Sequence, residues 1–308
     1  MPFLRGIIKI KRETRLFYMF IGLWIIMFFF LNVIPMLYSF YLSLTSYDGL
    51  TVPRFIAFKN YLTLLRDYRF IGSLVQTVKF TFLNIVATLI VSLLLANLLN
   101  KKMKGQLFFR GVLFLPYAVP VIASVFIWKT LLNRESGLIN LVLGMINSKL
   151  SLNLLVDTPM ISLISMFVWQ MGMSMVIFLA GLQNIPRDLI EAAEIDGASQ
   201  FLIFRKITIP LLSPLIMYQV IVGIMLSFSV IVQPILLTSS PGAAFTAFLN
   251  QQPPYQNFFT LIFVFQQAFT NQSFGIAMAA TWYMILVMFA LSLILLRATK
   301  RFVYYEYE

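Results

Sequence analysis

The chain has 308 residues, of which 60% are hydrophobic and only 11% are charged, and its mean hydropathy is +0.88. A soluble domain carries about a quarter charged residues, so this composition excludes a soluble protein and indicates a polytopic membrane protein. The net charge of +12 does not indicate nucleic-acid binding, because the basic residues cluster at the ends of apolar runs, as membrane topology requires. The absence of Cys and His removes thiol chemistry, thiolate metal sites and the commonest general base.

The N-terminal half predicts three membrane spans. Residues 1–15 are basic and form a cytoplasmic N-terminus, and the uncharged run that follows is too long for a signal peptide, so it predicts an uncleaved first span. A polar external loop over 45–74 precedes the second span, and a short basic internal loop precedes the third, which carries Pro116 and Pro120. The predicted spans are residues 16–44, 75–99 and 108–132.

The C-terminal half predicts three further spans. An external segment over 133–160 contains a short amphipathic piece near 138–146, and a charge-rich internal stretch over 184–210 follows the fourth span. The Pro-, Gln- and Asn-rich residues 238–273 predict an external loop, and residues 301–308 predict a cytoplasmic tail. The predicted spans are residues 159–182, 211–237 and 274–296.

The distribution of basic residues predicts the orientation. With six spans and both termini in the cytoplasm, the internal side carries fifteen Lys and Arg residues and the external side eight, which has the sign that the positive-inside rule requires. The exception is the first external loop, with Arg54, Lys59, Arg66 and Arg69. We therefore expect an all-α polytopic fold with one transmembrane domain over residues 16–300.

Residues 184–210 are the only charge-rich island between two long apolar segments, and we call them the hook. Pro186 can open a helix, because its missing N–H would be unsatisfied in the first turn anyway. Gly197 stands where a left-handed cap would end that helix, and Ser199 can cap a second short helix before the next span. Four acidic residues suit the first helix near its positive end, namely Asp188, Glu191, Glu194 and Asp196.

The charges that are missing restrict the function. Each predicted span core is free of Asp, Glu, Lys, Arg and His, and residues 207–296 hold no charge at all. Ion-coupled carriers usually keep an ionisable residue at membrane depth, and a charged solute would need a compensating charge, so a neutral polar solute fits better. No stretch matches GxxxxGK[ST], so the chain has no phosphate-binding loop of its own. Transport would therefore need a separate protein that supplies the energy, and this protein could bind at the hook.

Residues 191–214, EAAEIDGASQFLIFRKITIPLLSP, closely resemble the EAA motif of the permease subunits of binding-protein-dependent ABC importers. Ile209 departs from the Leu that is common there. Residues 114–140 are similar to the MalF/UgpA type of carbohydrate permease, one half of a heterodimer. The resemblance covers residues 15 to 300 and departs over 238–260, where the usual loop is shorter.

The resemblance implies the type I ABC importer permease fold and a set of partners in a prokaryotic cytoplasmic membrane. These are a second permease subunit, two ATPase subunits that bind ATP and magnesium, and an extracytoplasmic binding protein that delivers the sugar. This chain would bind no cofactor or metal and would not be an enzyme. Carried over residue by residue, the positions that couple to the ATPase are Glu191, Ala192, Ala193, Asp196, Gly197 and Pro210.

Two spans beside the hook supply candidates for the solute pathway, because polar residues in spans tend to face the bundle interior. On the fourth span Met166, Gln170 and Met173 recur at helical spacing, and on the fifth Gly223, Ser227 and Val230 do so. The alternative is that Gln170 and Ser227 only bridge helices. Tyr117 and Trp128 could stack on a sugar ring, although anchoring or packing is the simpler interpretation.

Two other function classes remain open. One is an importer permease for a non-sugar solute, such as glycerol phosphate, an amino acid or a phosphonate; an anionic solute should require a cation in the spans. The other is a secondary carrier or channel with a coincidental hook. The sequence offers no catalytic constellation for a membrane enzyme.

Overall fold

A computed structural model describes residues 12–101, 103–146, 153–238 and 253–299. Most of the predicted N-terminus (1–11), the central part of the predicted loop (239–252) and the predicted tail (301–308) lie outside the described residues. The described chain is mostly helical, with one small two-stranded sheet. Four helices are long and apolar enough to cross a membrane, or six if two bent pairs each count as one span. The all-α polytopic fold class is thus confirmed, whereas the membrane boundaries and the orientation stay predictions.

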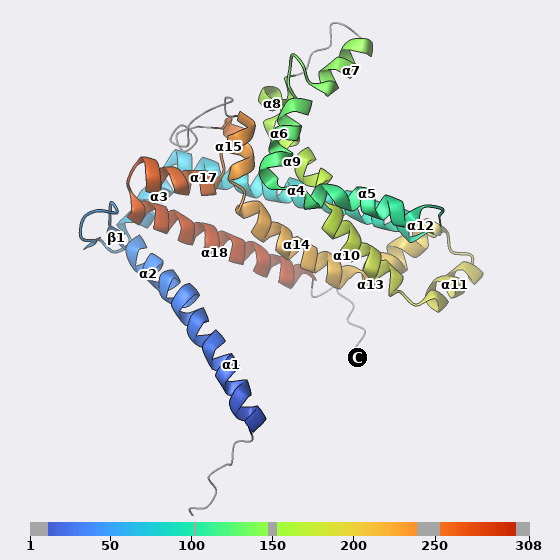
Figure 1. Ribbon diagram of the computed structural model, residues 1–308, viewed down its shortest axis with the longest axis horizontal. Coiled ribbons are helices and arrows are strands. Elements are labelled where there is room, and N and C mark those ends of the chain that lie inside the picture. The colour runs from blue at the N-terminus through green and yellow to red at the C-terminus, as the bar shows by residue number, and fades with distance from the viewer. Residues whose placement is uncertain (1–11, 102, 147–152, 239–252, 300–308) are drawn as a thin grey trace, which may run out of the picture.

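The first helix runs away from the rest of the molecule. It comprises α1 (Arg12–Phe28), the π-helical turn η1 (Phe29–Val33) and α2 (Ile34–Ser43). The π turn ends at Val33, two residues before Pro35, which lacks the N–H for a regular helical bond. At the end of this turn the N–H of Ile34 bonds to Phe29 O. Figure 1 shows α1 leaving the bundle obliquely, and the apolar run over 16–43 is almost wholly exposed.

A compact corner joins this helix to the second span. Strands β1 (Thr45–Ser46) and β2 (Arg54–Phe55) pair antiparallel, and α3 (Lys59–Arg66) follows them. The helix α4 (Tyr68–Asn100) then starts within the predicted loop, because Asp67 Oδ1 accepts hydrogen bonds from Arg69 N (2.8 Å) and Phe70 N (3.3 Å). This N-cap fixes the start of the longest helix at the corner.

The third and fourth predicted spans are not continuous helices. The third divides into α5 (Gln106–Ala118) and α6 (Val121–Leu131), which meet at 100°. The fourth divides into α9 (Pro159–Trp169) and α10 (Gly172–Gln183), which meet at 50°. Between them lie α7 (Leu138–Ile146) and α8 (Leu154–Asp157). In Figure 1, α6, α7 and α8 project from the bundle, whereas α9 packs on α4.

The C-terminal third also differs from the expected pattern. The hook begins with α11 (Arg187–Ile195), whereas α12 (Gln200–Ile203), η2 (Phe204–Thr208) and α13 (Ile209–Leu211) run without interruption into α14 (Ser213–Phe228). The predicted fifth span is broken after Phe228, and α15 (Val232–Thr238) follows. Where a loop over 238–273 was predicted, the described part is largely helical. Its elements are η3 (Tyr255–Asn257), α17 (Thr260–Phe265) and η4 (Gln266–Thr270), and α18 (Phe274–Thr299) ends the described chain.

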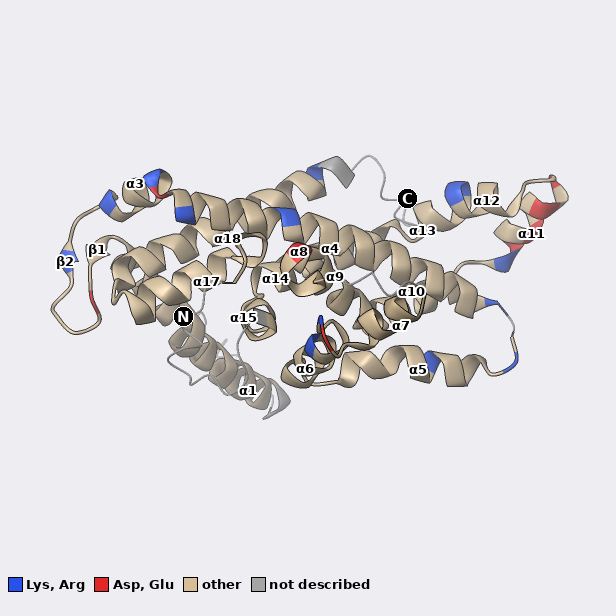
Figure 2. Cartoon of the chain, turned by 90° about the horizontal axis from the view of Figure 1, so that it is seen from above, with Lys and Arg blue, Asp and Glu red and all other residues tan. Residues whose placement is uncertain are grey.

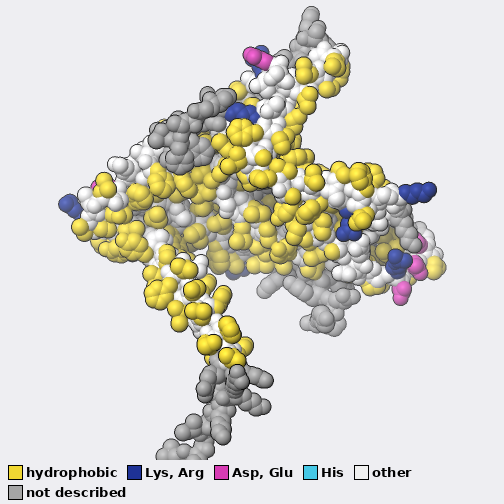
Figure 3. Space-filling model, in the orientation of Figure 1, with side chains coloured by type: hydrophobic (Ala, Val, Ile, Leu, Met, Phe, Trp, Pro, Cys, Tyr) yellow, Lys and Arg dark blue, Asp and Glu magenta, His cyan; other side chains and the backbone are white. Residues whose placement is uncertain are grey.

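Helix α4 is the centre of the bundle, because it contacts α9, α10, α14 and α17. One core cluster lies away from the hook, around Phe80, Phe259 and Phe263, and another lies towards the hook, around Phe178 and Leu212. Charged residues gather at the two ends of the bundle, over α11 and α12 and over α3 with the strands (Figure 2). Apolar side chains cover most of the visible surface between these ends (Figure 3).

Candidate functional site

The first helix of the hook ends in a glycine cap, as its sequence predicts. Gly197 has φ +77°, a left-handed conformation that L side chains rarely adopt. The N–H of Gly197 bonds to Glu194 O (3.0 Å), and the N–H of Ala198 bonds to Ala193 O (2.9 Å). These two bonds form the Schellman motif, which satisfies the last carbonyl groups of a helix and reverses the chain. Pro186 precedes α11 as its N-cap, one position earlier than the first helical residue.

The second half of the hook is joined to the fifth span without a break. Ser199 Oγ accepts from Leu202 N (3.3 Å) and so caps the helix, as predicted. Pro210 cannot donate a helical hydrogen bond, and the turn before it widens into the π helix η2, where Ile209 N bonds to Phe204 O. Pro214 likewise leaves Pro210 O without its usual donor, and Ser213 Oγ donates to it at 2.6 Å. The helix therefore continues through both prolines, and the predicted separate short helix is instead the first turns of a longer one.

The predicted coupling residues lie on an exposed surface. No residue of α11 is buried, and Glu191, Ala192, Asp196 and Gly197 are all exposed, whereas Ala193 and Pro210 are half-buried. Beside them Ile195 exposes 86% and Phe201 71% of their surface to solvent. Large apolar side chains this exposed, next to small residues, form a surface that a partner could cover.

The inner side of the hook is anchored on the bundle. Ile190 of α11 packs against the core cluster that contains Ile185, Leu182 and Leu212. The same cluster includes Ala96 and Leu99 at the end of α4, as well as residues of α10. A displacement of the hook would thus reach α10 through Ile185 and α14 through the uninterrupted helix.

The candidate pathway residues of the fourth span do not share one helical face, and this expectation is wrong. Helix α9 ends at Trp169 and α10 begins at Gly172, so the break falls on Gln170 and Met171. Met166 is fully buried in the core, whereas Met173 exposes 43% of its surface. The spacing of Met166, Gln170 and Met173 would place them on one face only if the helix were unbroken.

Gln170 connects the two broken spans. Its Nε2 donates to Ser124 Oγ on α6 at 2.9 Å and approaches Val119 O, the carbonyl at the end of α5, at 3.4 Å. Gly172 lies on the other side of the same break, and a Cβ added there would stand 2.8 Å from Phe114 Cα. The break between α9 and α10 therefore contacts the other broken span at two points. Gln170 reaches the α5–α6 break through its amide, and Gly172 packs against the backbone of α5. The amide contact supports the helix-bridging interpretation of Gln170.

The candidates of the fifth span face α4. A Cβ on Gly223 would stand 2.8 Å from Ile85 Cγ1, and Ser227 Oγ accepts from Asn84 Nδ2 at 3.3 Å. Val230 lies beyond the end of α14, where it is buried in the core. Gly223 and Ser227 thus hold α14 close to α4, which again is the bridging alternative rather than an open solute site.

Two buried polar residues, one on α4 and one on α14, were missed by the sequence analysis. Asn84 and Gln219 each expose only 8% of their surface, and among the described residues Asn84 Oδ1 and Gln219 Nε2 are buried without a hydrogen-bond partner. Such groups are costly in a membrane. The signal was present, because both stand in apolar runs where a polar residue at membrane depth is unusual.

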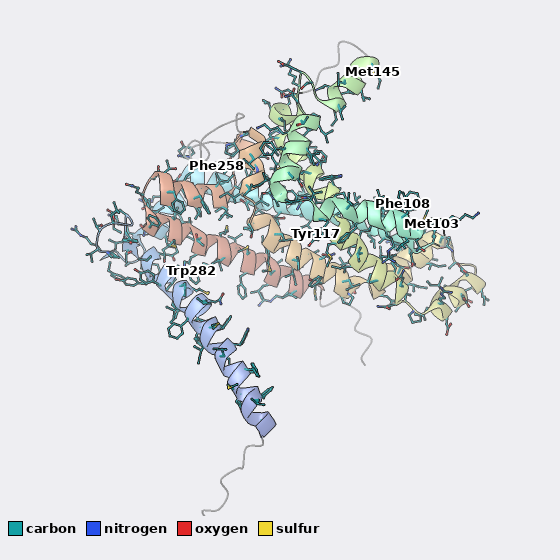
Figure 4. All side chains as sticks on the ribbon, viewed as in Figure 1. Met103, Phe108, Tyr117, Met145, Phe258 and Trp282 are labelled. Atoms are coloured by element: carbon teal, nitrogen blue, oxygen red, sulfur yellow. The ribbon has the colours of Figure 1, made fainter. Side chains whose placement is uncertain are left out.

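The aromatic candidates have different environments. Trp128 packs edge to face on Trp169, with ring centroids 6.3 Å apart, and contacts the core cluster around Phe80, as expected for a packing residue. Tyr117 exposes 50% of its surface and lies beside Phe114, with ring centroids 5.5 Å apart (Figure 4). Of the two, Tyr117 is the ring that a solute could reach.

Comparison with known proteins identifies the family to which the chain is similar. Residues 88–303 match the profile of the family described as binding-protein-dependent transport system inner membrane component. The chain is 31% identical to the probable ABC transporter permease protein YesP of Bacillus subtilis, over 97% of this chain and 94% of that protein. It is 34% identical to the trehalose/maltose transport system permease protein MalF of Thermococcus litoralis, over 78% and 83%.

The fold matches that of a bacterial ABC transporter that imports the acidic polysaccharide alginate. The TM-score is 0.77 at 21% identity, and the match covers 95% of this chain and 97% of that chain. This likeness confirms the predicted importer permease fold.

Proposed function

We propose that this chain is the membrane-spanning subunit of an ATP-driven importer for a neutral carbohydrate. The premise is that the chain belongs to the family of binding-protein-dependent transport system inner membrane components. The trehalose/maltose relative supports a saccharide as the solute. The low charge of the predicted span cores supports a neutral one, because nothing there would compensate a charged solute.

The proposed assembly has four kinds of subunit in a prokaryotic cytoplasmic membrane. This chain pairs with a second permease subunit, two ATPase subunits bind ATP and magnesium below them, and an extracytoplasmic binding protein delivers the sugar. This chain itself would bind no cofactor and catalyse no reaction. Both termini and the hook face the cytoplasm, in agreement with the excess of basic residues on that side.

The observation that carries this proposal is an exposed hook on a rigid connection. In the proposed complex α11 lies in a groove of the ATPase, where Ala192 and Ala193 permit close approach and Glu191 can pair with a cation of the groove. When the ATPase pair closes, the hook moves with it. The uninterrupted helix from Gln200 to Phe228 then carries this movement into the fifth span, and Ile190 carries it to the ends of α4 and α10.

The solute is proposed to pass between the broken spans, where Tyr117 is exposed and the Gln170 amide joins the two breaks. The six pathway candidates keep this role as a proposal, although several of them also bridge helices. An anionic solute is the second candidate, because a relative is named a glycerol-3-phosphate permease, with 30% identity over 82% of this chain. It is less well supported, since the half-buried cation Lys129 already donates to Leu236 O at 3.0 Å.

A cysteine cross-linking experiment tests the docking of the hook. The natural chain has no Cys, so Ala192→Cys introduces a unique thiol. We expect this thiol to form a disulfide with single cysteines placed along the groove of the co-expressed ATPase subunit. The matched control is Met145→Cys, which is 86% exposed and lies at the tip of α7, far from the hook (Figure 4). Equal cross-linking of both variants, or of neither, would contradict the proposal.

A further inference from the structure

Helix α3 has three distinct faces. Asn60 and Leu64 form a buried face, with 6% and 0% of their surface exposed. Phe58, Leu62 and Leu65 recur at helical spacing on a second face and expose 63%, 58% and 55% of their surface. The exposed cations Lys59 and Arg66 recur on a third face. A short helix with one apolar and one cationic outer face has the pattern of a helix that lies at a membrane surface.

The buried face fixes α3 against two spans. Asn60 Nδ2 donates to Ser43 O (2.9 Å) and to Thr45 O (2.8 Å), where α2 ends. The hydroxyl groups of Tyr61 and Ser43 lie 2.7 Å apart, and Tyr283 Oη of α18 donates to Tyr61 O at 3.3 Å. The helix is therefore held at the edge of the apolar bundle, at the end opposite the hook (Figures 1 and 2).

Lys59 and Arg66 lie along one open groove. It has a volume of about 440 Å³ and is lined by Lys59, Leu62, Thr63, Arg66 and Asp67. The Asp67 carboxylate caps α4 through Oδ1, so that one of its oxygens already accepts two backbone N–H groups. The groove thus combines two cations with one carboxylate that is already hydrogen-bonded, and its net charge is positive.

The charge of this corner is unusual for its side of the membrane. Four of the eight Lys and Arg residues on the predicted external side fall in this loop, against the positive-inside bias. Arg69 is already used inside the fold, because its Nη2 donates to Gln266 Oε1 (3.2 Å) and its guanidinium lies over the ring of Phe258, which Figure 4 labels near α17. Lys59 and Arg66, in contrast, point into the open groove.

We infer that α3 is an interfacial helix that binds an anionic phosphoglyceride, phosphatidylglycerol being the simplest. The headgroup phosphate lies between Lys59 and Arg66, a headgroup hydroxyl donates to Asp67, and the acyl chains lie along Phe58, Leu62 and Leu65. The cations supply electrostatic attraction and the apolar face supplies burial, which together give stable binding at the interface. The inference rests on the proposed function only for its membrane setting.

Lipid retention tests the inference directly. The full chain, purified with its partner subunits, is placed in nanodiscs of equal parts phosphatidylglycerol and phosphatidylethanolamine, and retained lipids are identified by native mass spectrometry. In the double variant Lys59→Gln/Arg66→Gln we expect the affinity for phosphatidylglycerol to fall about 30-fold, since each basic residue near an anionic surface contributes to binding. The matched control Lys59→Arg/Arg66→Lys keeps both positive charges at the same two positions and should retain the lipid.

Two results would overturn the inference. The first is unchanged retention of phosphatidylglycerol in the double variant, and the second is equal retention of both lipids by the natural chain. If the first result is accompanied by weaker capture of the solute-binding protein, this face belongs to a protein partner instead. Lipid retention is measured without any transport assay. A negative result for lipid binding would therefore leave the proposed ATP-driven uptake untouched, so the lipid proposal and the transport proposal can fail separately.

Discussion

Gly197→Ala isolates the conformational requirement at the tip of the hook. The residue has φ +77°, and a Cβ added there would meet no atom within 4 Å. Alanine therefore adds no clash within this chain, and its cost is the left-handed backbone alone, roughly 1–2 kcal/mol. Since 1.4 kcal/mol is a factor of about ten, a hook that must keep this turn would populate it roughly 5- to 30-fold less often.

Gly197→Asn separates backbone conformation from docking space. Asparagine tolerates the left-handed region better than other residues with a side chain, so we expect it to retain most of the activity that alanine loses. The assay is the initial rate of ATP-driven uptake of labelled sugar in proteoliposomes that contain the complete complex, with equal amounts of permease verified by immunoblot. Unchanged uptake by the alanine variant would refute the conformational argument. Equal loss in both variants would instead show that the ATPase requires the empty space.

Three further variants test the contacts between spans through the melting temperature of the purified complex and through uptake. Gln170→Leu removes the amide that joins the two breaks and should cost about 1 kcal/mol, whereas Ser165→Ala, whose hydroxyl bonds only within α9, should be neutral. Gly172→Ala should cost about 1–3 kcal/mol by overpacking, whereas Gly111→Ala, with no atom within 4 Å of the new Cβ, should not lower the melting temperature. Ser227→Ala should lower the melting temperature if it bridges helices, and should raise the KM for sugar if it lines the pathway.

The hook could be predicted because its signals are local. The cap at Gly197 and the cap at Ser199 depend on residues within one turn of each other, and both occur as expected. The continuation of the second helix through Pro210 and Pro214 could not be predicted, because it depends on a π turn and on the Ser213 hydroxyl, which together compensate for the missing N–H groups.

The breaks in the spans were missed because hydropathy shows only that a segment is apolar, and does not show whether its helix axis changes direction. Pro116 and Pro120 both lie in the third predicted span, but only packing decides that the chain turns by 100° between α5 and α6. The break at Gln170 has no proline and is defined by partners on another span, which regular spacing along one helix cannot reveal. The same limit applies to Asn84 and Ser227, whose pairing across α4 and α14 is a tertiary contact.

Energised uptake by reconstituted components tests the central claim most directly. One set of liposomes contains this chain alone. A second set contains the chain together with the second permease, the ATPase subunits, ATP and the loaded binding protein. In both sets, accumulation of labelled sugar against its concentration gradient is measured. The account predicts accumulation only in the complete system, and its loss when Glu191→Lys replaces the natural chain. Sustained uphill accumulation by the chain alone, with no ATPase present, would contradict it.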